Sequence, residues 1–320
     1  MKVLVADKFE QSGLDGISAL GVELDYQPDL KDEALRDAVH SGGTELLVVR
    51  STKVPAAVIE GSALKLIIRA GAGYNTIDVD AATANGAYVA NCPGKNAAAV
   101  AELAFGLMLA VDRRIPDNVS EFRAGRWSKK GFGKAKGLSG RTLGLVGMGM
   151  IGKEMVKRAK AFDMPVLCFS RWMTPEDAAQ AGVELASSPE DLAAKSYVVS
   201  VHTSLNPATK GLLGASFFEA MQPGSIFINT SRAEVVDQSA LEKAMNDGKL
   251  RAGLDVFEDE PATPEGEYSG SLLNQKAAYC THHIGASTDQ AQEAVANETV
   301  RIVDQFIKTG TPPNAVNSPS

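Results

Sequence analysis

Three glycines spaced as Gly147-x-Gly149-x-x-Gly152 are the feature that most restricts what this chain of 320 residues can fold into. They follow the apolar run Leu143–Val146, which has the length of a buried strand, and they open a segment with helical spacing. In that context the first glycine allows a tight turn, the second lets the backbone approach a pyrophosphate, and the third lets helix and strand pack closely. The motif predicts a dinucleotide site whose phosphates meet the free N–H groups of the helix. The residues expected there are Gly147, Gly149, Met150, Ile151 and Gly152.

Apolar runs of strand length alternate with longer helical segments over nearly the whole chain. This alternation is typical of βαβ units, whose parallel strands are buried on both faces. We therefore predict an α/β protein with two doubly wound parallel-sheet domains. The expected strands are 3–6, 22–26, 46–49, 66–68 and 88–90 in the first half, and 143–146, 165–169, 197–201, 225–229, 252–257 and 278–280 in the second.

The segments that connect and follow these two series also carry local signals. Residues 96–111 form a long apolar run without strand punctuation, which predicts a buried helix joining the two halves. Residues 123–141 are basic and contain glycines, so we predict a loop or arm there. A last helix is predicted at about residues 287–308, ending at Gly310, and we expect it to pack on the first domain.

Charge and composition exclude several classes of function. A formal net charge of -7 and a pI near 5.3 oppose nonspecific nucleic-acid binding, which needs a cationic face. No apolar run approaches the ~18 residues of a membrane helix, and no signal-peptide pattern follows Met1. The three widely spaced cysteines, Cys92, Cys168 and Cys280, are predicted to be buried free thiols in a reducing compartment. We expect a cytoplasmic protein without nucleic-acid or membrane partners.

Three functional side chains follow three successive predicted strands. Arg232 comes after the strand at 225–229, Glu260 after 252–257, and His283 after 278–280. The carboxyl ends of parallel strands share one edge, where open α/β sheets bind ligands. Oxidation of a hydroxy acid to a keto acid needs a base for the hydroxyl proton, and imidazole titrates near neutral pH. We predict that His283 is this base, that Glu260 orients it, and that Arg232 binds the substrate carboxylate and the reacting oxygen.

A metal site is the alternative use of the histidines. The chain has four, and His282 and His283 lie close to Cys280. This group lacks any C-x-x-C or H-E-x-x-H spacing, so no metal is predicted.

The cofactor type depends on the end of the next strand. NAD-specific sites usually place an acidic residue there to bind the ribose 2′-hydroxyl, and this chain has Ser170 and Arg171 instead. Ser170 can bond a 2′-phosphate, and Arg171 can pair with it or stack on adenine, which favours NADP over NAD. The alternative is a surface arginine beside a site indifferent to the 2′ position.

These motifs together resemble the D-isomer-specific 2-hydroxyacid dehydrogenases, and most closely their 3-phosphoglycerate dehydrogenase members, which act in serine biosynthesis. The resemblance covers nearly the whole chain, with several separate motifs in the right order. The matching stretches are 49–54 (VRSTKV), 69–75 (RAGAGYN), 91–94 (NCPG), the glycine loop, 201–203 (VHT), 229–232 (NTSR), 253–257 (GLDVF) and 281–288 (THHIGAST).

The resemblance implies the roles of further residues. Arg232, Glu260 and His283 match the catalytic triad of the family, and Asp255 matches the residue that holds the nicotinamide carboxamide. Further cofactor contacts are expected from His202, Thr203, Thr230 and Ser231. The loop whose N–H groups receive the substrate carboxylate corresponds to Gly71, Ala72 and Gly73, and other substrate contacts are expected from Arg50, Ser51, Arg69 and Asn96.

The resemblance also implies an architecture. A flavodoxin-like substrate domain would combine residues 1–97 with 287–320, and a Rossmann dinucleotide-binding domain would occupy 98–286. A homodimer is implied, formed through the cofactor domains and the arm at 123–141. The chain stops soon after residues 314–317, so we expect a short form without the serine-sensing C-terminal domain of longer members.

The sequence does not decide which hydroxy acid is the substrate. Arg50 and Arg69 could bind a 3-phosphate, which favours 3-phosphoglycerate, converted to 3-phosphohydroxypyruvate. NADP preference instead favours an NADPH-dependent glyoxylate or hydroxypyruvate reductase. A nicotinamide-sensing corepressor is a remote alternative with the same fold, but the chain has no added partner-docking segment.

Overall fold

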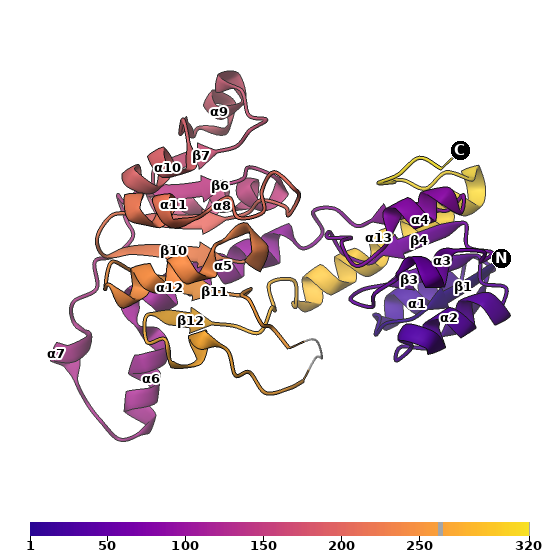
Figure 1. Cartoon of the computed structure of the whole chain (residues 1–320), viewed down its shortest axis with the longest axis horizontal. Helices are drawn as coiled ribbons and strands as arrows, with labels where there is room; N and C mark the ends of the chain where they lie inside the picture. The colour runs from indigo at the N-terminus through magenta and orange to yellow at the C-terminus, as the bar shows by residue number, and fades with distance from the viewer. Residues whose placement is uncertain (262–264, 320) are drawn as a thin grey trace. The chain divides into compact units, whose positions relative to one another are not determined.

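The computed structural model describes residues 1–261 and 265–319, and the chain divides into two compact units (Figure 1). The first unit comprises Met1–Asn96 and Ala286–Ser320, and the second comprises Ala97–Gly285. In the part of the chain that the structure describes, each unit has one sheet, whose strands pair in parallel. One isolated antiparallel bridge joins Ala90 to Ala315. The predicted α/β class with two parallel-sheet domains is confirmed.

The sheet of the first unit has five strands in the order β2-β1-β3-β4-β5, the flavodoxin-like order. Its strands are β1 (Lys2–Val5), β2 (Glu23–Tyr26), β3 (Leu46–Val49), β4 (Leu66–Arg69) and β5 (Tyr88–Asn91). Apolar residues of α1 (Gln11–Ser18) and α13 (Asp289–Thr309) cover one face. The other face is covered by α2 (Asp32–Ser41), α3 (Ala56–Ile59) and α4 (Val79–Ala84).

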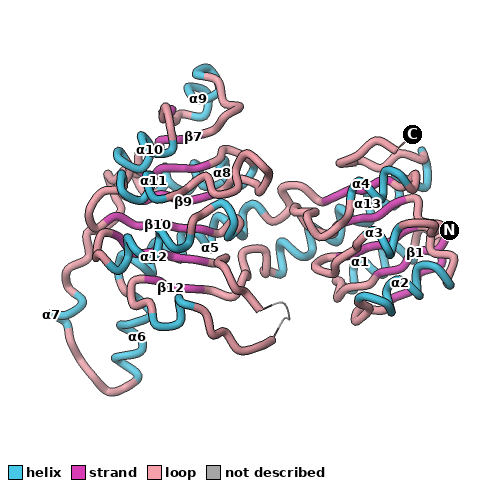
Figure 2. Tube along the Cα trace, viewed as in Figure 1, coloured by secondary structure: helices cyan, strands magenta, loops and turns pink. Residues whose placement is uncertain are grey.

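The sheet of the second unit has seven strands in the order β12-β11-β10-β9-β6-β7-β8, which lie side by side in Figure 2. They are β6 (Leu143–Val146), β7 (Val166–Phe169), β8 (Glu184–Leu185), β9 (Val198–Val201), β10 (Ser225–Asn229), β11 (Leu250–Leu254) and β12 (Ala278–Cys280). The sequence predicted six strands and missed β8. Two residues are too short for an apolar pattern, and β8 exists because it pairs with β7 at the edge of the sheet.

Helices cover both faces of this second sheet. The faces are packed by α5 (Ala97–Arg113) with α8 (Met150–Ala161) on one side, and by α10 (Pro189–Lys195), α11 (Ala215–Ala220) and α12 (Gln238–Asn246) on the other. Short elements complete the unit: α9 (Pro175–Ala181) and the 3-10 turns η1 (Ala233–Val235) and η2 (Ser271–Asn274). The helix α6 (Ile115–Arg123) is joined to the edge strand β12, because the Tyr279 hydroxyl donates to Asp117 at 2.8 Å. Figure 1 shows α7 (Lys129–Phe132) standing away from this sheet. The predicted loop at 123–141 therefore contains one short helix, whose cap is Ser128.

Local signals explain where α13 begins and ends. The Thr288 hydroxyl accepts a hydrogen bond from the N–H of Ala291, which caps the first turn. Gly310 ends the helix in the left-handed conformation, as its position after the apolar pattern suggested. The helix therefore starts a few residues after His283, and its apolar stripe packs in the first unit.

The cysteines and the helices bear on the predictions made from composition. All three cysteines are free, but Cys280 is exposed, so the prediction of three buried thiols was wrong there. The cause is that β12 forms the edge of its sheet, where one side of the strand has no neighbour. Among the helices that the structure describes, none is long and apolar enough to cross a membrane.

Candidate active site

The carboxyl ends of β10, β11 and β12 lie next to one another at one edge of the second sheet. Arg232, Glu260 and His283 follow these three strands in turn. The structure brings Glu260 and His283 into direct contact: Nδ1 of His283 lies 2.8 Å from Oε2 of Glu260. The two side chains are 53% and 29% exposed, so the pair is open to a ligand but partly shielded from water.

Glu260 is held on its second oxygen as well. Its Oε1 accepts a hydrogen bond of 3.0 Å from the backbone N–H of Phe257. A carboxylate accepting from Nδ1–H leaves Nε2 as the ring nitrogen that exchanges a proton. The pair therefore presents one defined nitrogen of His283 to its surroundings.

This contact changes the proton affinity of both groups. The hydrogen bond to Glu260 raises the pKa of His283 above its ordinary value of 6.5, and partial burial of the ring offsets only part of the rise. Burial raises the pKa of Glu260, but the hydrogen bonds from His283 and from the Phe257 N–H outweigh it, so its pKa lies below the ordinary value. The contact therefore stabilises the protonated form of His283 beside the negatively charged carboxylate of Glu260.

Arg232 is oriented by the turn after β10. Its Nη1 donates to the carbonyl oxygen of Ser231 at 2.7 Å. The buried Asn229 side chain closes the turn, because its amide donates to the Arg232 carbonyl and its oxygen accepts from the Ser231 N–H, both at 3.0 Å. The positive charge of Arg232 contributes a lowering effect to the pKa of both Glu260 and His283.

Asp255 fixes the segment that carries His283. It is 1% exposed, and its Oδ1 accepts from the hydroxyl of Thr281 at 2.6 Å and from the N–H of Ile284 at 2.9 Å. Its Oδ2 accepts from the N–H of Gly285 at 2.8 Å. Between these anchors His283 has a φ of 53°, in the left-handed region that non-glycine residues seldom adopt. Three hydrogen bonds to one carboxylate hold the backbone in this strained conformation.

The glycine loop follows β6 at the same edge of the sheet. Gly147 has a φ of 101°, and a Cβ there would lie 2.6 Å from the carbonyl oxygen of His202. A Cβ on Gly152 would lie 2.7 Å from the Gly147 carbonyl oxygen. A Cβ on Gly149 would meet no atom within 4 Å, so its smallness is not needed by the folded chain itself. Gly149 is the position where the protein backbone would approach a bound ligand closely, and there the missing side chain would leave the needed space.

Strands neighbouring β6 carry the other residues expected at the cofactor. Ser170 and Arg171 follow β7, and a guanidinium N–H of Arg171 donates to the Ala208 carbonyl at 2.8 Å. His202 and Thr203 follow β9, and Thr230 and Ser231 follow β10, where the Ser231 hydroxyl bonds the Thr203 carbonyl. Burial lowers the pKa of His202 to about 3, so this ring is neutral, and its Nε2 pairs with the Ser200 hydroxyl at 2.9 Å.

The residues expected at the substrate lie in the first unit, after β3, β4 and β5. Gly71 has a φ of 150°, and a Cβ there would collide with the Arg69 guanidinium, so this guanidinium lies against the loop at 71–73. The amide of Asn91 donates to the Ala72 carbonyl at 2.6 Å and supports the loop. Arg50 and Ser51 follow β3, and Asn96 is the last residue of the unit before α5. The structure therefore gathers the expected substrate contacts in one unit and the expected catalytic and cofactor residues in the other.

Comparison with known families agrees with this arrangement. The model of the NAD-binding domain of D-isomer specific 2-hydroxyacid dehydrogenases matches residues 105–285. The chain belongs to the D-isomer specific 2-hydroxyacid dehydrogenase family. The resemblance stated from its motifs is confirmed.

Several members of the family are similar over most of the chain. D-3-phosphoglycerate dehydrogenase of Archaeoglobus fulgidus is 39% identical over 323 residues, which are 100% of this chain and 60% of that protein. This chain thus spans about 60% of the length of that relative. Glyoxylate reductase of Thermococcus litoralis is 39% identical over 280 residues, 85% of this chain and 83% of that one. A crystal structure of glyoxylate reductase from Paecilomyes thermophila has a TM-score of 0.88 and 29% identity, covering 99% of this chain and 98% of that chain.

The structure shows supporting residues that the motifs of a 2-hydroxyacid dehydrogenase did not reveal. Buried Gln238 accepts the N–H of Glu258 at 2.7 Å and so holds the acidic turn that carries Glu260. Asp7 binds the turn after β3. Each is a polar residue at the end of a strand or start of a helix, and only its position beside the site signals it in the sequence. No cluster of three His, Cys, Asp or Glu suited to a metal occurs among residues 1–261 and 265–319.

Proposed function

We propose that this chain is a nicotinamide-dependent dehydrogenase of D-2-hydroxy acids, and that 3-phosphoglycerate is its substrate. The observation that carries the proposal is the His283–Glu260 hydrogen bond of 2.8 Å at the sheet edge that also bears the glycine loop. A base with a fixed tautomer at the ligand-binding edge of a dinucleotide fold has the properties that alcohol oxidation needs.

The chain's own residues then divide the work of the reaction. In oxidation, Nε2 of His283 accepts the hydroxyl proton, and the negative charge of Glu260 stabilises the imidazolium that forms. Arg232 binds the substrate carboxylate and stabilises negative charge on the reacting oxygen. When bound, the nicotinamide supplies the hydride acceptor. In the reverse direction His283 returns the proton to the carbonyl oxygen.

The cofactor contacts proposed here belong to the second unit. The open space at Gly149 and the left-handed Gly147 fit a pyrophosphate against the first turn of α8, with Met150, Ile151 and Gly152. Ser170 and Arg171 favour a 2′-phosphate, and so NADP. The remaining proposed contacts are His202, Thr203, Thr230, Ser231 and Asp255. We assign residues 98–286 to cofactor binding, and residues 1–97 with 287–320 to substrate binding.

The substrate assignment rests on cations beside the loop at 71–73. The loop at Gly71, Ala72 and Gly73 would receive the carboxylate through the N–H groups of Ala72 and Gly73, because the Gly71 N–H already donates to the Arg69 carbonyl at 2.8 Å. Arg50 and Arg69 would receive the phosphate. Ser51 and Asn96 complete the proposed contacts. The similarity to D-3-phosphoglycerate dehydrogenases supports this choice. The second candidate is an NADPH-dependent glyoxylate or hydroxypyruvate reductase. Ser170 and Arg171 favour it, as does similarity to a glyoxylate reductase and to a hydroxypyruvate reductase.

Steady-state absorbance at 340 nm separates the two candidates. NAD and NADP are each combined with 3-phosphoglycerate and glycerate, and NADH and NADPH with hydroxypyruvate and glyoxylate. We expect oxidation of 3-phosphoglycerate at the highest kcat/KM. Reduction of glyoxylate or hydroxypyruvate by NADPH without phosphoglycerate oxidation would establish the reductase instead. No turnover with any pair would contradict the dehydrogenase assignment.

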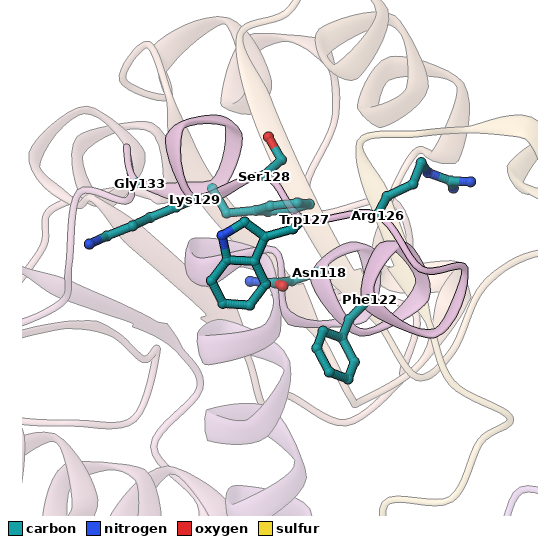
Figure 3. A pocket seen from close by; sticks show the side chains of 8 residues that line it. Asn118, Phe122, Arg126, Trp127, Ser128, Lys129 and Gly133 are labelled. Carbon is teal, nitrogen blue, oxygen red and sulfur yellow. The ribbon is translucent and has the colours of Figure 1, made fainter.

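We also propose that the protein forms a homodimer and that the arm at residues 123–141 takes part in the interface. Phe122 on α6 is 66% exposed and Trp127 is 80% exposed, and Figure 3 shows them lining a hollow together with Lys129 and Gly133. Large exposed aromatic side chains gathered in one place are typical of interaction surfaces. Sedimentation velocity tests this proposal, since a dimer would have twice the mass of 33.7 kDa.

A further inference from the structure

Arg50 occupies a specific place at the carboxyl edge of the first sheet. Strands β3 and β4 pair with Val49 opposite Arg69, so Arg50 and the segment Ala70–Gly73 leave the sheet side by side. The Ala70 N–H also bonds the Val49 carbonyl at 2.8 Å, which keeps the two strand ends together. Arg50 therefore begins the turn that neighbours the loop proposed to receive the substrate carboxylate.

The backbone of this turn is fixed by one carboxylate. Oδ2 of Asp7 accepts hydrogen bonds from three successive N–H groups, at 2.6 Å from Arg50, 3.2 Å from Ser51 and 3.1 Å from Thr52. Oδ1 accepts from the hydroxyls of Ser51 at 3.4 Å and Thr52 at 3.0 Å. The N–H and hydroxyl of Ser51 already have a partner in the folded chain. What the turn offers a ligand is chiefly the side chain of Arg50.

The Arg50 guanidinium is held by neutral groups. Its Nη1 donates to Oε1 of Gln292 on α13 at 2.9 Å and to the Lys8 carbonyl at 3.4 Å. Among the residues that the structure describes, no carboxylate forms an ion pair with Arg50. Other arginines of the chain differ, since Arg158 is paired with Glu154 and Arg301 with Glu298. Arg50 is thus anchored while its charge stays available.

We propose that Gln292 is a positioning residue that makes the first unit select 2-hydroxy acids bearing a second anionic group, such as a phosphate. It fixes the Arg50 guanidinium through an amide oxygen and adds no negative charge beside it. A carboxylate at the same place would satisfy the same hydrogen bond but would neutralise the cation. An apolar side chain of equal length would leave the charge free but release the guanidinium. The amide of Gln292 both holds the guanidinium in place and leaves its charge unpaired with a carboxylate at that position. This inference rests on the proposed function.

The test compares two substrates that differ in the phosphate alone, 3-phosphoglycerate and glycerate, in three variants. Gln292→Glu places a carboxylate oxygen where the amide oxygen now lies, and we expect kcat/KM for 3-phosphoglycerate to fall by roughly 10- to 100-fold. Glycerate turnover should change little. Gln292→Met should give a smaller loss, of a few fold, because the charge remains. Gln290→Glu is the matched control, since it makes the same charge change on the exposed surface of the same helix.

The ratio of kcat/KM for the two substrates is the decisive quantity. The role of Gln292 would be overturned if this ratio were the same in the unmodified protein, in Gln292→Glu and in Gln292→Met. It would also be overturned if the ratio fell as far in Gln290→Glu as in Gln292→Glu. A general loss of structure would lower kcat/KM for both substrates by the same factor and leave their ratio unchanged.

Calorimetric titration with 3-phosphoglycerate separates this inference from the proposed function. If the unmodified chain binds 3-phosphoglycerate and Gln292→Glu weakens binding at least tenfold, the inference stands even where no turnover is found. If turnover of 2-hydroxy acids is found but phosphoglycerate binding does not respond to Gln292→Glu, the inference fails and the dehydrogenase assignment stands.

Discussion

Replacing His283 by alanine is expected to lower kcat by about 10²- to 10⁴-fold while leaving cofactor affinity nearly unchanged. In the proposed mechanism the imidazole exchanges the hydroxyl proton, and Glu260 bonds its Nδ1 at 2.8 Å. Its removal takes away the proton acceptor but touches neither the glycine loop nor the strand ends around it. Turnover at 340 nm and calorimetric titration with NADP and NAD measure the two quantities.

His282→Ala is the matched control for this variant. His282 is exposed and adjacent to His283, so its replacement tests the same backbone segment without the proposed base. We expect turnover close to that of the unmodified chain. Full turnover in His283→Ala would remove His283 from the mechanism, and an equal loss in both variants would point to damage of the segment.

Replacing Asp255 by asparagine is expected to lower kcat/KM by roughly 10- to 100-fold and to destabilise the protein by about 1–3 kcal/mol. The asparagine amide keeps one oxygen but turns the second acceptor into a donor that faces an N–H or hydroxyl of the segment 281–285. A buried donor is then left without its acceptor, and the left-handed conformation of His283 loses support. Urea unfolding gives the stability and the 340 nm assay gives kcat/KM.

Asp247→Asn provides the comparison for Asp255→Asn. Asp247 is exposed and pairs with Lys243 on the surface, a contact worth little in water. We expect neither stability nor kcat/KM to move appreciably there. An Asp255→Asn protein with unchanged activity and stability would show that the segment carrying His283 does not depend on this carboxylate.

The parts of the fold that were predictable are those governed by strand-length apolar runs. The expected strand at 225–229 coincides with β10, and 143–146 with β6, because these strands are buried on both faces and their pattern is continuous. The strand β8 was missed because its two residues owe their conformation to β7. The position of β12 at the edge of its sheet likewise explains why Cys280, the last residue of that strand, is exposed.

The site was predictable to the extent that it depends on topology. Parallel neighbours end at one edge, so Arg232, Glu260 and His283 could be expected together from their positions after three successive strands. The sequence could not show how they are held. The hydrogen bonds of Asp255 to 281–285 and of Asp7 to 50–52 join residues far apart in the chain, and a left-handed φ at His283 follows from those contacts rather than from local propensity.

We propose that His283, paired with Glu260, exchanges the hydroxyl proton as the hydride moves, and the pH dependence of kcat/KM in both directions is the measurement that tests this role. Oxidation needs neutral His283, so its kcat/KM should rise with pH and level off above the pKa of the ring. Reduction needs the protonated ring, so its kcat/KM should fall as pH rises through the same pKa. Because Glu260 raises this pKa, both midpoints should lie above 6.5. Midpoints below 6.5, or profiles that run in the same direction for oxidation and reduction, would contradict this role of His283.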